Sequence, residues 1–189
     1  MSNDSAVATA PGTTSLPTGT WTVDPVHSSV EFQVKHLGIA TVKGQFNEFE
    51  GTLEVGPDGA KAYGSVNVAS VDTREPQRDD HLRSADFFEV DSYPKIDFRS
   101  TAIRPTGEDE FEIDGDLEIH GEKRAITLKA AIEGTETDPQ GNDRVGLSVT
   151  GQIDRSDHNM KFNAALGSGN VVVSDKVKLL IDISAVKSA

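Results

Sequence analysis

Apolar and polar residues alternate along most of this chain. Between Phe111 and His120, every odd position is apolar or glycine and every even position is an acidic residue or His. The same period recurs over 126–132, 145–153 and 177–183. A period of two puts every second side chain on one face of a β-strand. Because no helical segments alternate with these strands, the pattern predicts an all-β, antiparallel sheet, and closing that sheet gives a barrel with an apolar lumen.

Turn residues and prolines divide the pattern into about eight strands and one short helix. Strands are expected over 20–24, 28–36, 41 to the turn at 56–59, 63–71, around 96–98, 109–120, 123–136, 144–154 and 171–186. A hairpin turn is expected at Gly121-Glu122, and a kink near Ser174-Asp175. The helix is expected over 78–85 with its start at Glu75-Pro76, since proline is tolerated in the first turn.

The strand that starts near residue 41 changes phase along its length. Phe46 lies on its even face, whereas Phe49 and Leu53 lie on its odd face. One extra residue would bring both sets to the same side of the sheet. We therefore predict a β-bulge near Asn47-Glu48, of the kind that bends a strand at a barrel corner.

The alternation also predicts which side chains face the lumen. The inward set comprises Phe32, Val34, Phe46, Val66, Val68, Ile96, Phe98, Phe111, Leu117, Leu128, Val149, Leu179 and Ile181. In an eight-stranded barrel such residues either fill the interior or leave room for one small ligand. Glycines in or beside strands are expected to thin this core and favour a cavity; they are Gly44, Gly64, Gly115, Gly146 and Gly151.

The 189 residues suit one domain with a sizeable core. Residues 1–19 are rich in Ser, Thr, Ala, Pro and Gly and lack the basic and apolar regions of a secretory signal. They are expected to be a disordered tail before a barrel domain over 20–189, and the protein is expected to be cytoplasmic. A net charge of -13 leaves no basic stripe for nucleic acid and disfavours anionic membrane surfaces. No apolar run reaches the length of a membrane span, so no stable membrane insertion is expected.

Residues that would carry catalysis or bind a cofactor are sparse. The absence of cysteine excludes disulfides, thiolate metal sites and cysteine nucleophiles. The five histidines form no local chelating motif, and the chain has neither a Gly-x-Ser-x-Gly elbow nor a phosphate-binding glycine loop. The densest acid and histidine cluster, Asp154, Asp157 and His158, is interpreted as stabilising a turn. We therefore predict no catalytic residue, no metal and no cofactor.

The segment from Arg78 to Phe88 is the best candidate for a functional loop. A short helix flanked by apolar residues can plug or gate the mouth of a barrel, with Leu82, Phe87 and Phe88 touching a ligand. The alternative is that both phenylalanines cap the core and Asp79 pairs with Arg83. A ligand's head group would be faced by three polar side chains of this segment, Arg78, His81 and Arg83, together with His36.

Several separate motifs, in order, resemble those of the YceI-like, polyisoprenoid-binding family. They are Trp21 to Val30, Val34 to Ile39, Val42 to Phe46, Arg78 to Phe88 with Tyr93-Pro94, and Val173 to Val177 before the last strand. The resemblance implies a lipocalin-like barrel that holds a long isoprenoid or acyl chain; some members are dimers, and many carry a signal peptide. The chain departs from the family at His158 and Asn159, where an aromatic residue and glycine are usual, and at Phe162, where Trp is common.

We predict from this a non-enzymatic protein that binds, stores or carries an isoprenoid-type lipid, with a homodimer as a possible assembly. The candidate ligand-binding residues are Phe32, Val34, His36, Phe46, Phe49, Val66, Val68, Arg78, His81, Leu82, Phe87, Phe88, Phe98, Phe111, Leu117 and Phe162. Two alternatives are a redox accessory or enzyme that presents a quinone or acts on a lipid, and a partner-binding module whose cavity is incidental.

Overall fold

The structure, a computed structural model, describes residues 16–164, 166–168 and 171–188. Its strands are β1 (Gly19–Val23), β2 (Ser29–His36), β3 (Ala40–Phe46), β4 (Phe49–Gly56), β5 (Gly59–Asn67), β6 (Val71–Asp72), β7 (Lys95–Gly107), β8 (Glu110–Ile119), β9 (Glu122–Thr137), β10 (Asp143–Asp154) and β11 (Val173–Lys187). One α-helix, α1 (Pro76–Arg83), accompanies three short 3-10 helices: η1 (Pro25–His27), η2 (Val68–Ser70) and η3 (Arg155–His158).

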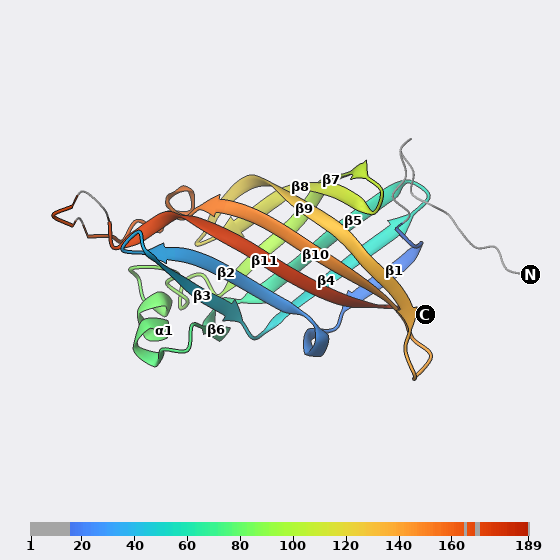
Figure 1. Cartoon of the computed structure of the whole chain (residues 1–189), viewed down its shortest axis with the longest axis horizontal. Coiled ribbons are helices and arrows are strands. Elements are labelled where there is room, and N and C mark those ends of the chain that lie inside the picture. The colour runs from blue at the N-terminus through green and yellow to red at the C-terminus, as the bar shows by residue number, and fades with distance from the viewer. Residues whose placement is uncertain (1–15, 165, 169–170, 189) are drawn as a thin grey trace, which may run out of the picture.

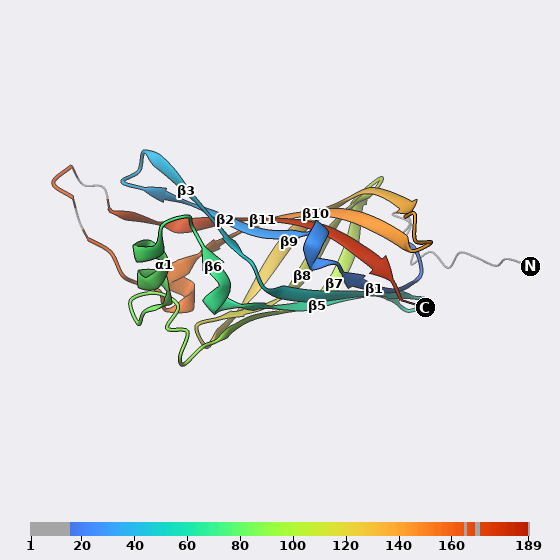
Figure 2. The same cartoon turned by 90° about the horizontal axis from the view of Figure 1, so that it is seen from below.

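Eight of these described strands close into an antiparallel barrel, which confirms the predicted fold (Figures 1 and 2). The ring runs β1-β4-β5-β7-β8-β9-β10-β11 and is closed by pairing between β1 and β11. The long strand β11 pairs with β1 through residues 185–187 and with β2 through residues 173–182. β2, β3 and β6 therefore extend the sheet at the end of the barrel where α1 lies.

The barrel turns a corner between β3 and β4. The predicted change of phase is present, because Phe46 is buried and Phe49 also borders the lumen. The predicted bulge is wrong, since the strand ends at Phe46 and a new one starts at Phe49. The backbone groups freed at this break are satisfied elsewhere: Asn47 donates its N–H to Ser70, and Glu48 accepts from Asn67.

Three other boundaries concern turns. The strand expected over 63–71 breaks after Asn67, whose side chain accepts a hydrogen bond from the Ala69 N–H and so caps η2. The β8–β9 hairpin turns at His120-Gly121, one residue earlier than predicted, with both residues at positive φ. The expected kink near Ser174-Asp175 is confirmed by a shift of the β2–β11 register between Val173 and Val177.

The two ends of the barrel are closed differently. At one end, α1 and the segment after it cover the opening; Pro76 lies in the first turn, and the Glu75 side chain accepts from the Gln77 N–H. At the other end, Leu16 and Trp21 are buried in the main core cluster. Residues 1–15 of the predicted tail lie outside the described residues. None of the described helices has the length and apolarity that a membrane crossing needs.

Candidate functional site

The barrel lumen holds a cavity of about 230 Å³. Its walls come from the inward faces of all the strands except β6, and they consist almost entirely of aliphatic and aromatic side chains. An apolar cavity of about 150 Å³ already stays dry and takes up a small hydrocarbon. Drug-sized ligands occupy roughly 300–1,000 Å³. The lumen in this conformation therefore fits a short hydrocarbon segment.

The predicted inward set agrees closely with the cavity wall. Every member borders the cavity except Val34 and Val68. Val34 lies near the turn of the β2–β3 hairpin, where it pairs with Val42 and Val177. Val68 follows the end of β5 in η2 and is buried against Phe46 and its neighbours outside the cavity.

The glycines affect the lumen in two ways. Gly51 and Gly64 pair across β4 and β5 and both border the cavity, so the expectation holds for Gly64. At Gly44, Gly115 and Gly151, a Cβ would lie within 3.0 Å of Phe32, Phe98 and Leu128, respectively. Neighbouring side chains thus fill the space above these three glycines. Gly146 is not among the residues that border the cavity.

Five polar residues adjoin the cavity, but their side chains lie in the outward phase of β2, β4 and β5; they are Glu31, Glu50, Thr52, Tyr63 and Ser65. On the outer face, Tyr63 donates to Glu54 and Ser65 donates to Glu50. The β4 and β5 members of this group also line a polar groove of about 520 Å³, in which the Arg99 guanidinium lies 5.4 Å from the centre of the Tyr63 ring. The wall between lumen and groove is thin at Gly51 and Gly64, which have no side chains and border both.

The arginines of the α1 segment hold the helix on the barrel. Arg78 donates to the hydroxyl and the carbonyl of Thr73, at 2.8 and 2.7 Å. Arg83 donates to the carbonyls of Ala69 and Val71 and pairs with Asp80. Arg83 therefore pairs with Asp80 and not, as expected, with Asp79, because the buried Asp79 accepts hydrogen bonds from Thr73 instead. Arg78 and Arg83 do not border the cavity.

The apolar residues of this segment divide between two locations. Leu82 and Phe88 pack on the cluster around Phe32 and Phe46, and Phe88 also contacts the cluster of Leu117, Ile119 and Met160. They therefore form the floor beneath the cavity at the α1 end without being among its lining residues. Because Phe88 joins two core clusters, it fixes the α1 segment to the barrel.

Phe87, His81 and Phe162 form an aromatic cluster outside the cavity. The His81 ring lies edge-on to Phe87 and Phe162, with centroids 5.1 and 4.9 Å away, and its Nε2 lies 2.8 Å from Asp86. The Arg155 guanidinium lies 5.9 Å from the Phe87 ring and donates to the carbonyls of Met160, Val173 and Ser174. Burial lowers the pKa of Arg155. This cluster ties α1 to the segment after β10.

Two histidines are buried at the same end: His120, for which the sequence suggests no role, and His158, for which the sequence indicates a role in stabilising a turn. His120 places Nδ1 3.2 Å from the His158 carbonyl and Nε2 3.2 Å from the Glu89 carboxylate, with its ring against Tyr93. His158 places Nδ1 2.9 Å from the Glu122 carbonyl. Asn159 has a φ of 58°, a left-handed conformation that asparagine tolerates well. Neither His158 nor Asn159 borders the cavity. Among the described residues, no three His, Cys, Asp or Glu side chains are grouped so that they could hold a metal ion.

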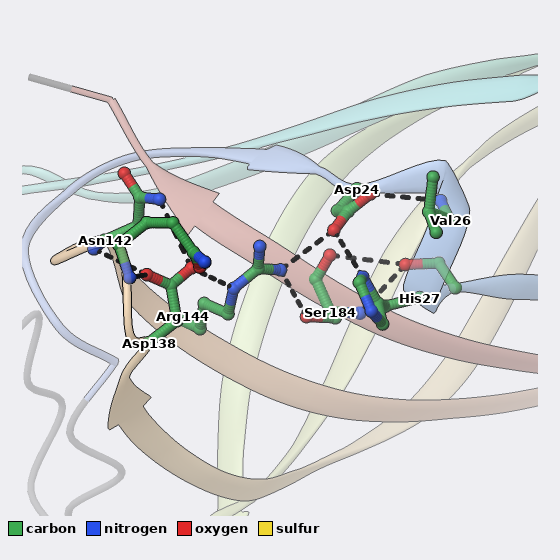
Figure 3. Close-up of polar contacts among 9 residues, drawn as sticks. Asp24, Val26, His27, Asp138, Asn142, Arg144 and Ser184 are labelled. Carbon is green, nitrogen blue, oxygen red and sulfur yellow. Dashed lines mark hydrogen bonds and ion pairs between the residues drawn. The ribbon is translucent and has the colours of Figure 1, made fainter.

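A charged network closes the end of the barrel opposite to α1 (Figure 3). Arg144 donates to Asp138 at 2.7 Å and to Asp24 at 2.9 Å, and so joins the β9–β10 turn to the end of β1. The hydrogen bond from Arg144, with that from the Asn142 N–H next, lowers the pKa of Asp138 to about 2. His27 and then Arg144 lower the pKa of Asp24 to about 2. This network supports the barrel and lies outside the cavity.

Of the candidate ligand-binding residues, the structure brings seven together around the cavity: Phe32, Phe46, Phe49, Val66, Phe98, Phe111 and Leu117. The others lie in the α1 segment, in its aromatic cluster, in η2 (Val68) or, with Val34 and His36, near the turn of the β2–β3 hairpin. Wall residues absent from that candidate list include Trp21, Gly51 and Leu53. The period of two already identifies Leu53, which shares a phase with Phe49. Trp21 comes from a strand too short to show a period.

The comparisons with known proteins agree with this geometry. A family model described as the YceI-like domain matches residues 21–185. Protein YceI of Shigella flexneri is 38% identical over 164 residues, which cover 85% of this chain and 82% of that protein.

Solved structures show the same fold. A YceI protein of Campylobacter jejuni superposes with a TM-score of 0.69 at 28% identity, over 82% of this chain and 90% of that one. A polyisoprenoid binding domain from Saccharophagus degradans superposes with a TM-score of 0.66 at 15% identity, over 89% of this chain and 98% of that one. The family-model match spans most of the barrel, and the chain therefore belongs to the YceI-like family.

Proposed function

We propose that this protein binds the hydrocarbon chain of an isoprenoid-type lipid in its lumen and does so without catalysing a reaction. The observation that carries the proposal is the cavity of about 230 Å³ walled by apolar side chains. Removing a methylene group from water into such a wall stabilises a complex by about 0.8 kcal/mol. The similarity in fold to a domain described as polyisoprenoid binding supports this choice of ligand.

The charges near the lumen favour a neutral head group. The cavity wall is apolar, and the cations expected to receive a phosphate, Arg78 and Arg83, donate to carbonyl, hydroxyl and carboxylate groups of the chain itself. A hydroxyl or a quinone carbonyl carries no net charge, so bringing it against an apolar wall costs much less free energy than bringing a phosphate there. We therefore propose a prenyl alcohol or quinone in preference to a prenyl phosphate.

A long chain needs more room than the lumen offers in this conformation. The two places where the barrel can lengthen the cavity are its covered ends, at Phe88 and at Leu16. We propose that a long ligand displaces the α1 segment, because few apolar side chains hold it: Leu82 and Phe88 are only partly buried.

The single tryptophan makes the proposal testable, because Trp21 is buried and borders the cavity. Titrating the purified protein with farnesol should change the Trp21 fluorescence and saturate. Farnesyl phosphate should bind more weakly. Solvent extraction of the protein followed by mass spectrometry should recover a neutral prenyl lipid. No recovered lipid together with no response to farnesol would refute lipid binding.

A pair of alanines on β9 provides a matched variant and control. Ala130 is buried and borders the cavity, whereas Ala125 lies on the other face of the same strand and is exposed. Ala130→Phe should fill the lumen and weaken farnesol binding at least tenfold. Ala125→Phe should bind farnesol as the native protein does. Equal affinity in both variants would place the ligand outside the lumen.

A further inference from the structure

One region of this acidic protein contains no acidic residue. Although 31 of the 189 residues are Asp or Glu, none occurs in 32–47 or in 158–174. These two segments meet at one end of the barrel. The Leu37 N–H donates to the Val172 carbonyl at 2.9 Å, and His36 pairs with Val173. The local charge of these two segments therefore differs from the net charge of -13, although α1 and Asp86 bring carboxylates to the same end of the barrel.

Lysines gather on the outer wall beside this end. Gln33 pairs with Lys43 of β3 and with Lys178 of β11, so the three side chains form a row across three strands. Lys35 lies two residues further along β2 and shares the face opposite to the buried Phe32. These three lysines are exposed, and within the described parts of the chain none of them forms an ion pair with a carboxylate.

Apolar side chains project from the same end. Ile39 lies in the turn of the β2–β3 hairpin and is 79% exposed. Val171 and Phe162, on the segment that follows η3, are 41% and 37% exposed. Figure 1 shows the β2–β3 hairpin turn at the same end of the barrel as α1. Large apolar residues exposed next to lysines resemble the composition of surfaces that rest on a lipid headgroup layer.

We propose that this end, comprising Ile39, Phe162, Val171 and the lysines at 35, 43 and 178, docks reversibly on an anionic lipid bilayer. Ile39 would enter the headgroup region, and the strand face that carries the three lysines would lie obliquely against the bilayer surface. Charge complementarity selects this partner, because each lysine near an anionic bilayer is attracted to it while the missing carboxylates remove the opposing repulsion. The nearest acids along the chain, Glu31, Glu48, Asp157 and Asp175, flank the two segments.

Docking here would serve the proposed function. The biological use of docking rests on the proposed function, whereas the docking itself does not. The α1 segment that covers the lumen is at the same end of the barrel. A lipid that leaves the bilayer would therefore reach the covered opening without crossing the outer wall. The acidic residues of α1 itself, Asp79 and Asp80, lie outside the acid-free segments, so the hairpin rather than the helix faces the bilayer.

Vesicle flotation tests the proposal with the full chain. The protein should float with vesicles of phosphatidylcholine and phosphatidylglycerol, and much less with phosphatidylcholine alone. Raising the salt from about 0.1 M to about 1 M shortens the screening length from about 10 to about 3 Å and should release it. Ile39→Asp should reduce the bound fraction at least tenfold. Lys43→Gln and Lys178→Gln should each reduce it roughly fivefold.

Matched controls come from the rest of the surface. Val26, in η1, is 84% exposed and precedes the start of β2, at the other end of that strand from the hairpin turn, so Val26→Asp should leave flotation unchanged. Lys61→Gln and Lys129→Gln, on β5 and β9, should do the same. Ile39→Asp should retain the farnesol response of Trp21, which separates a failure of docking from a failure of lipid binding.

Three results would overturn the proposal. The first is native protein that floats with neither kind of vesicle, and the second is a loss of binding by Val26→Asp equal to that by Ile39→Asp. The third is self-association that Ile39→Asp abolishes in the absence of vesicle binding, which would assign the hairpin end to a protein interface.

Discussion

Glycine at positions 44 and 115 sets where aromatic rings lie inside the barrel. Gly44 pairs directly with Phe32, and the Phe32 ring occupies the space that a side chain at residue 44 would need. Phe98 covers Gly115 in the same way from the neighbouring strand. Each ring then lies against backbone and leaves the centre of the lumen empty. The glycines thus preserve the cavity by giving the rings somewhere else to pack.

This arrangement predicts opposite outcomes for two Gly→Ala changes. Gly44→Ala should push the Phe32 ring toward the lumen and destabilise the fold by about 1–3 kcal/mol, the usual range for overpacking. It should also weaken farnesol binding, because the displaced ring occupies the cavity. Gly134→Ala, in β9, meets no atom within 4 Å and should be neutral or stabilise by up to about 1 kcal/mol. Chemical denaturation of both variants measures the difference; equal destabilisation would contradict it.

His120 shows how a residue disfavoured by local geometry is retained by distant contacts. It occupies the first position of a two-residue hairpin turn with a φ of 54°, where asparagine is the usual choice. Its ring, however, reaches both Glu89 and the His158 carbonyl, from two segments that cover the α1 end. Turn preference alone cannot identify such a residue, because its partners are remote in sequence.

At the scale of elements, α1 is held mainly by polar contacts. Asp79 is buried and accepts from both the N–H and the hydroxyl of Thr73, while Arg78 donates to the same hydroxyl. Removing the carboxylate leaves a buried N–H without its acceptor. We expect Asp79→Ala to destabilise the protein by about 1–3 kcal/mol.

The effect should be local. Hydrogen exchange should accelerate in residues 73–90 of Asp79→Ala and stay unchanged in β8 to β11. The neighbouring Asp80→Ala provides the control, since Asp80 is 80% exposed and, in the described part of the chain, pairs with Arg83 alone; exposed pairs of this kind contribute at most about 1 kcal/mol. Uniformly faster exchange across the barrel would show that α1 is no separate unit.

The elements differ in how well the sequence predicts them. β8 to β11 are long, and their alternation gave their position, direction and inward faces. The corner at Asn47-Glu48 shows only as a change of phase, which a bulge and a strand break produce equally. What decides between them is hydrogen bonding to Ser70 and Asn67, and these contacts require the folded chain.

For the molecule as a whole, the sequence predicts the cavity wall better than the ends of the barrel. Periodicity places side chains on the inner or outer face, and that is sufficient for a wall built from long strands. Whether Arg78 faces a ligand or a carbonyl is decided by its hydrogen bonds to Thr73, which lies before the helix. The periodicity of the sequence does not predict these hydrogen bonds. The burial of Leu16 is likewise invisible in a segment with tail-like composition.

The charge network at the end opposite to α1 sets how the whole barrel responds to acid. Asp24 and Asp138 have pKa values of about 2 in the folded protein, below the ordinary value of 3.8. Depressed pKa values mean that the folded state favours the carboxylates, so their contribution to stability is fully present above about pH 4. It is lost as the pH falls through about 2, when both carboxylates are protonated in the folded and unfolded chains alike.

Arg144→Met removes the largest cause of the low pKa of Asp138 and the second largest for Asp24. The variant should melt at a lower temperature than the native protein at pH 7, and this difference should shrink as the pH falls from about 4 to about 2. Arg99→Met removes an arginine that stacks on Tyr63 and forms no carboxylate ion pair among the described residues, so its melting difference should not follow this pH dependence. Melting curves by circular dichroism across this range measure both. A gap for Arg144→Met that stays constant down to pH 2 would mean that Asp24 and Asp138 titrate normally and that the network does not couple the three segments it joins.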